Sequence, residues 1–86
     1  MIVPTIHSNG TSPDVLKDAL RTAHHKLEKA ITALAQTTPH GRDYYPQGPD
    51  AINAALIEHR SRHNRLVTIQ GELFQLWLAI DERTPS

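Results

Sequence analysis

Apolar side chains recur at intervals of three and four residues from Leu16 to Leu34. These intervals place them on one face of an α-helix. Ser12 is suited to cap the helix N-terminus, and Pro13 loses no hydrogen bond at the first helical position. Pro39 opposes further helix. The pattern predicts a helix over residues 12–37.

A second pattern of the same period runs over residues 52–80, after a Gly-Pro pair that favours a new helix start. It predicts a helix over residues 49–82. His59 and His63 interrupt its apolar face, and buried polar groups need partners. Gly71 costs about 1 kcal/mol relative to alanine in a helix interior, which indicates close packing at that point.

The two predicted helices are separated only by a loop over residues 38–48, so we expect them to fold back as an antiparallel hairpin. Residues 1–11 form a lead-in whose first part is rich in β-formers and predicted to be extended, and residues 83–86 form a fraying tail. The fold class is therefore all-α, with one domain over residues 1–86. One hairpin has little interior and the chain has no cysteine, so assembly as a homo-oligomer is expected.

If Gln36 lies opposite Asp50, the register of the hairpin places His24 near Arg62. Basic side chains of both helices then meet at mid-height and form a site for phosphate groups, which arginine binds bidentately. The alternative is a solvated polar face in which glutamates pair with these cations. The members of this predicted cationic cluster are Lys26, Arg60, Arg62, Arg65, His59 and His63.

His59 and His63 are also spaced to present two imidazoles to one metal ion. No acidic residue or third ligand completes a recognised motif around them. Packing or phosphate contact is the favoured interpretation, and no metal or cofactor is expected.

The loop holds Arg42, Tyr44 and Tyr45, which are suited to stack on a nucleobase. Alternatively, the tyrosines cover the open end of the hairpin and Arg42 pairs with a nearby acid. Trp77 falls on the apolar stripe and indicates core or an oligomer interface.

A second candidate anion site precedes the first helix. Backbone amides beside a glycine at a helix N-terminus can hold an anion, assisted by hydroxyl groups. Simple capping is the favoured alternative here. The residues of this segment are Asn9, Gly10, Thr11 and Ser12.

The formal net charge is zero, which disfavours general binding to nucleic acid or to anionic membranes. The N-terminus lacks the pattern of a signal peptide, and the apolar run over residues 76–80 is too short to cross a bilayer. A cytoplasmic protein is expected. No nucleophile and base stand at a readable spacing, so we predict no catalytic residues and no enzymatic activity.

Two segments carry a resemblance, residues 9–12 (NGTS) and residues 39–48 (PHGRDYYPQG). They resemble those of a group of small uncharacterised phage and prophage proteins, over nearly the whole chain. In size, hairpin layout and expected oligomerisation the chain is also similar to the phage anti-CBASS cyclic-nucleotide sponges. Those helical oligomers sequester immune signalling nucleotides without cleaving them. This second likeness rests on architecture and implies no role for any single residue.

The hypothesis is a phage-encoded anti-defence protein that binds and sequesters a small, cyclic nucleotide in the host cytoplasm. Tyrosines and Arg42 would stack on bases, while the cationic cluster and residues 9–12 would hold phosphates at a subunit boundary. The alternative is a protein-interaction module that inhibits a host protein or assists phage assembly. Its surface would be the apolar face around Phe74 and Trp77.

Overall fold

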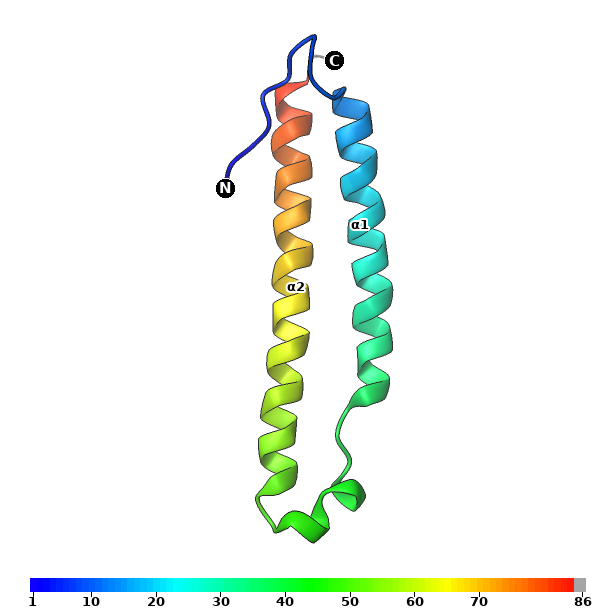
Figure 1. Cartoon of the computed structure of the whole chain (residues 1–86), viewed down its shortest axis with the longest axis vertical. Coiled ribbons are helices and arrows are strands. Elements are labelled where there is room, and N and C mark those ends of the chain that lie inside the picture. Colours follow the sequence, from blue (N-terminus) through cyan, green and yellow to red (C-terminus); the bar gives the residue numbers. More distant parts are fainter. Residues whose placement is uncertain (85–86) are drawn as a thin grey trace.

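Two long helices lie side by side and antiparallel, joined at one end by a loop of short helical turns (Figure 1). The computed structural model describes residues 1–84. Helix α1 spans Pro13–Leu34 and helix α2 spans Ala51–Arg83. No strand occurs in residues 1–84, so the prediction of an all-α, two-helix hairpin is confirmed. The molecule measures 61 × 21 × 19 Å.

Helix α1 begins as the sequence predicts. The Ser12 hydroxyl accepts a hydrogen bond from the Val15 amide at 3.3 Å, and Pro13 occupies the first turn. The helix continues into a 3₁₀ turn, η1 (Ala35–Thr37), where the Thr37 hydroxyl donates to the Leu34 carbonyl at 2.7 Å. The predicted helix over residues 12–37 thus corresponds to α1 together with η1.

The loop contains two further 3₁₀ turns, η2 (Gly41–Asp43) and η3 (Tyr45–Gln47). Gly48 follows with φ 110° and ψ 167°, a backbone conformation that is essentially restricted to glycine. This residue turns the chain toward α2, which begins at Ala51.

The register predicted from the sequence is wrong. The His24 ring packs against Phe74, with ring centroids 6.2 Å apart, and not against Arg62. At the loop end the Thr38 hydroxyl lies 3.2 Å from His59 Nε2. The 3₁₀ turns occupy the space beside the first turns of α2, so α1 faces only the later part of that helix. The slip amounts to about three helical turns.

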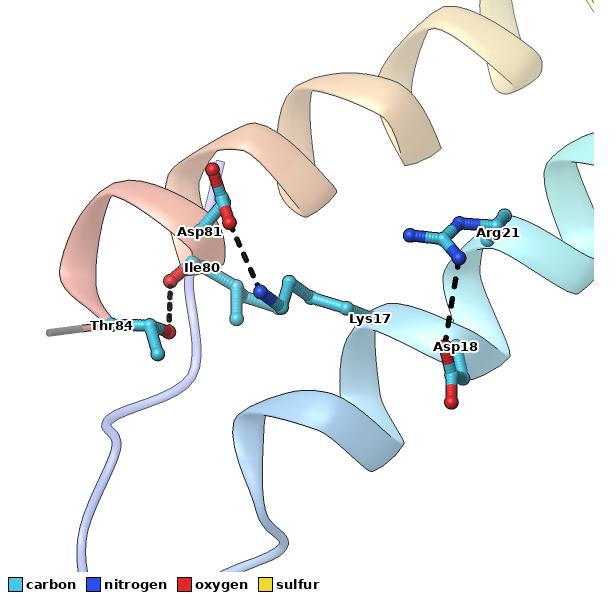
Figure 2. Close-up of polar contacts among 6 residues, drawn as sticks. All are labelled: Lys17, Asp18, Arg21, Ile80, Asp81 and Thr84. Atoms are coloured by element: carbon cyan, nitrogen blue, oxygen red, sulfur yellow. Dashed lines mark hydrogen bonds and ion pairs between the residues drawn. The ribbon is translucent and has the colours of Figure 1, made fainter. Parts of the chain in front are cut away.

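Very little of the hairpin is buried. Ile80, with 0% exposure, is the one buried hydrophobic residue in the described part of the chain. Figure 2 shows the Lys17 ammonium reaching from α1 to the Asp81 carboxylate on α2, at 3.0 Å, beside Ile80. The aliphatic part of the Lys17 side chain thereby helps to shield Ile80 from water, while its ammonium group is paired with Asp81.

The C-terminal end of α2 is capped. Thr84 donates its backbone N–H to the Asp81 carbonyl at 3.2 Å and its hydroxyl to the Ile80 carbonyl at 2.8 Å. The tail predicted to fray over residues 83–86 therefore begins with a helical residue and its cap, and residues 85 and 86 lie outside the described residues.

At the N-terminus, residues 1–7 form no helix or strand, and a turn follows in which the Gly10 amide donates to the His7 carbonyl at 3.1 Å. The lead-in runs beside the end of α2 (Figure 1). Neither α1 nor α2 combines the length and apolar character needed to cross a membrane, a finding that covers the described residues.

Candidate functional site

A polar pocket of about 500 Å³ lies between the loop and the first turns of α2. We call it the loop-end pocket. Its walls come from η1, the loop turns and α2, so side chains distant in sequence meet there. The polar and aromatic residues that line it are Thr37, Tyr44, Gln47, Glu58 and Arg62.

Tyr44 is held in the pocket wall by hydrogen bonds of its own backbone. Its amide donates to the Gly41 carbonyl at 3.0 Å, and its carbonyl accepts from the Gln47 amide at 2.9 Å. Its neighbour Tyr45 does not line the pocket and is 76% exposed. The structure therefore separates two tyrosines that the sequence treats alike.

Arg62 reaches the pocket from about three turns into α2. Its Nη2 atom lies 3.4 Å from Glu58 Oε2, one helical turn away, and both side chains are exposed. An exposed ion pair at this spacing contributes at most a few tenths of a kcal/mol. The guanidinium therefore remains available to a stronger anionic partner such as a phosphate.

His59 and His63 have different environments. His59 is partly buried and contacts Thr38, so it ties the loop to α2. His63 is exposed, which corrects its placement on the buried stripe. Within residues 1–84, no three His, Asp or Glu side chains gather in a way that could hold a metal ion.

The rest of the predicted cationic cluster does not converge in one chain, because it depended on the wrong register. Lys26 is exposed at a level where Gln70, not an arginine, reaches across to Glu28 at 2.6 Å. Arg60 is exposed outside the loop-end pocket. Arg65 donates to the Ser61 carbonyl at 3.3 Å and lines a separate hollow on the outer side of α2.

The two remaining groups of predicted residues lie at opposite ends of the molecule. Arg42 is exposed in η2, where its amide donates to His40 Nδ1 at 3.1 Å. Residues 9–12 are exposed at the far end, where α1 begins (Figure 1). Ser12 acts there as the helix cap, in agreement with the simpler interpretation of this segment. A single chain cannot bring residues 9–12 to the loop-end pocket.

A second hollow, which we call the apolar groove, lies between α1 and the C-terminal half of α2. It has a volume of about 320 Å³. Lys17 Nζ and Arg21 Cζ lie 5.6 and 5.9 Å from the Trp77 ring centroid, within the range of cation–π attraction. The buried Nε1 atom of Trp77 has no hydrogen-bond acceptor in residues 1–84. The lining residues are Leu20, Arg21, His24, Leu73, Phe74 and Trp77.

Sequence reasoning recognised the aromatic side of this groove but missed Arg21 and His24. The sequence did contain a signal for them. Arg21 follows the apolar Leu20 and His24 comes three residues later, so both lie on one side of the helix, at the border of its apolar face.

The chain matches no protein-family model, no curated protein and no solved structure. The loop-end pocket combines an aromatic ring, a guanidinium, an amide and a carboxylate, a set that can recognise a planar heterocycle attached to an anion. The apolar groove instead offers a largely hydrophobic surface, as an interface core does.

Proposed function

We propose that this protein binds a small nucleotide in the loop-end pocket and sequesters it without cleaving it. The supporting observation is that Tyr44 and Arg62, from the loop and from α2, line one pocket. The tyrosine ring stacks on the base and the guanidinium holds a phosphate. The volume of about 500 Å³ lies within the usual range for small-molecule sites.

Gln47 and Glu58 supply hydrogen bonds to the edge of the base. The Glu58 carboxylate only accepts hydrogen bonds, whereas the Gln47 amide both donates and accepts. A purine that presents amino or ring N–H donors satisfies the carboxylate. Arg62 then exchanges its weak ion pair with Glu58 for a phosphate, which leaves both side chains with a partner.

Sequestration is favoured over turnover by the chemistry of the lining residues. Glu58 is the one carboxylate among the described lining residues, and in the bound state it is engaged by hydrogen bonds from the base. The Thr37 hydroxyl donates its proton to the Leu34 carbonyl. A hydroxyl whose proton is committed in this way is a poor nucleophile. In the role suggested by the resemblance, the phage-encoded protein removes a cyclic nucleotide signal from a host defence effector in the cytoplasm.

A thermal-shift screen against cyclic di- and trinucleotides, linear dinucleotides and ADP-ribose tests this proposal. Ligand at 100 times its Kd adds about 2.7 kcal/mol of stability. For a domain of this size, that increase raises Tm by roughly 10–20 °C. Recovery of intact nucleotide after incubation would establish sequestration, and cleavage products would refute it. If Tm stays unchanged with every nucleotide, the proposed function is wrong.

Replacing Tyr44 with alanine is expected to weaken nucleotide binding by about 5- to 150-fold, because a base loses its stacking partner. Tyr45→Ala is the matched control, since the adjacent ring lies outside the pocket, and its Kd should stay within about threefold. Isothermal titration of both variants measures the difference. Equal losses at the two positions would contradict the assignment of stacking to Tyr44.

A protein-interaction module is the second candidate function, and the apolar groove is the observation that favours it. Phe74 borders this groove and remains exposed in a single chain. A host or phage protein could bury it. A homo-oligomer that covers Trp77 and Phe74 would count against this alternative.

A further inference from the structure

A single chain exposes more surface than a compact protein of its mass. Its accessible surface is 6510 Å², about 1,400 Å² above the roughly 5,100 Å² expected for a compact monomer of 9.6 kDa. Its radius of gyration is 18.9 Å, against about 12 Å for a globular chain of this length. A stable interface buries about 800 Å² or more on each partner. The excess is therefore enough for one such interface.

The apolar groove is the part of this surface best suited to be covered. Phe74, 46% exposed, projects beside the groove, so one face carries both a knob and a hole. Gly71 lies one turn earlier on α2, and a Cβ atom placed there would meet nothing within 4 Å in its own chain. The close packing expected at Gly71 from the sequence is therefore not found within a single chain, and the surface there is open to another molecule.

Two charges beside the groove indicate which molecule covers it. Arg21 and Glu28 are two helical turns apart, on the same side of α1. Within residues 1–84, no cation lies within 4.0 Å of the Glu28 carboxylate, and Arg21 reaches only Asp18, at 3.9 Å. A two-fold axis crossing α1 between His24 and His25 would bring each Arg21 opposite the partner's Glu28.

We infer that a second copy of this chain covers the apolar groove, in an antiparallel dimer with the two loops at opposite ends. In this dimer α1 packs along the partner's α1 over its full length, and α2 packs along the C-terminal half of the partner's α2. Each Phe74 enters the groove of the other copy, as the self-complementary contact of a two-fold interface requires. The four helices form a bundle whose core the single hairpin lacks.

The same symmetry has a consequence for the loop-end pocket, which rests on the proposed function. The axis that pairs Arg21 with the partner's Glu28 also places Thr37 opposite the partner's Ser12. Residues 9–12 of one copy, at the positive end of α1, then lie beside the loop-end pocket of the other. The two groups of predicted ligand residues that a single chain keeps apart would meet at a subunit boundary.

The first test is the mass in solution of the ligand-free protein, measured by light scattering and sedimentation. The unchanged chain is expected at twice 9.6 kDa or at a higher even multiple. Phe74→Ala should weaken association by roughly 30-fold or more, as expected for a central aromatic anchor. Ile69→Ala is the matched control, because Ile69 is 44% exposed on the same helix but lies outside the groove. An unchanged chain that stays monomeric up to 100 µM, or equal effects of the two variants, would overturn the inference.

Charge reversal tests the antiparallel orientation and does not depend on the stability of the Phe74 variant. Arg21→Glu alone and Glu28→Arg alone are each expected to weaken association by about 10-fold, because each places like charges together. An equimolar mixture of the two variants restores both attractive pairs in the heterodimer, as the double variant does in its homodimer, so both should recover association. Recovery supports the pairing in an assembly of any size. A double variant as weak as the single ones would overturn it. Neither test involves a nucleotide, so the dimer and the proposed function can fail separately.

Discussion

Replacing Ile80 with alanine is expected to remove about 2–5 kcal/mol of stability, the usual loss for a large aliphatic side chain in a core. Ile80 is completely buried, between Lys17 of α1 and the C-terminal cap of α2. A chain of this length has a net stability of roughly 4–13 kcal/mol, so the loss is a large part of the total. Urea denaturation followed by circular dichroism, at one fixed protein concentration, measures the change.

Ile57→Ala is the control for this prediction. The same side chain is deleted from the same helix, but Ile57 is 65% exposed, so its loss should change stability by no more than about 0.5 kcal/mol. If both variants lost the same stability, the burial of Ile80 beside Lys17 would not be a major source of the hairpin's stability. Because association adds to stability, both proteins must be compared at equal concentration.

The parts of the fold that depend on neighbouring residues could be predicted from the sequence. Ser12 and Pro13 begin α1 because capping and φ restriction act within one turn. The periodicity of α2 likewise identifies one long helix. The register could not be predicted, because it depends on how much length the loop occupies. The turns η2 and η3 are stabilised by i to i+3 hydrogen bonds that leave little pattern in the sequence.

The sequence predicted which types of residue form the candidate site, but not which individual residues line it. An aromatic loop and an arginine on α2 are both found in the loop-end pocket, but Tyr44 and not Tyr45 lines it. That distinction follows from the backbone turn between η2 and η3, which points consecutive side chains in different directions. Lys26 was grouped with the arginines only through the assumed register, and the observed contact of His24 with Phe74 removes that link.

Replacing Gly48 with alanine is expected to cost about 1–3 kcal/mol, because an L-residue at φ 110° and ψ 167° is strained. Steric contact is not the cause, since a Cβ atom at this position would meet nothing within 4 Å. If the loop instead relaxes to relieve the strain, Tyr44 and Gln47 move and the loop-end pocket loses its shape. The variant should therefore lose stability, nucleotide affinity, or both, as measured by urea denaturation and isothermal titration.

Two controls separate backbone strain from the mere addition of a methyl group. Gly41→Ala adds the same group to the same loop, again with open space around the Cβ atom, and Gly41 does not have a positive φ. Its effect on stability should be within about 0.5 kcal/mol. A chain assembled chemically with D-alanine at position 48 should keep the stability of the natural protein, because a positive φ is favourable for a D-residue. Equal losses of stability with L- and D-alanine would show that strain from the positive φ at residue 48 is not the cause of the loss.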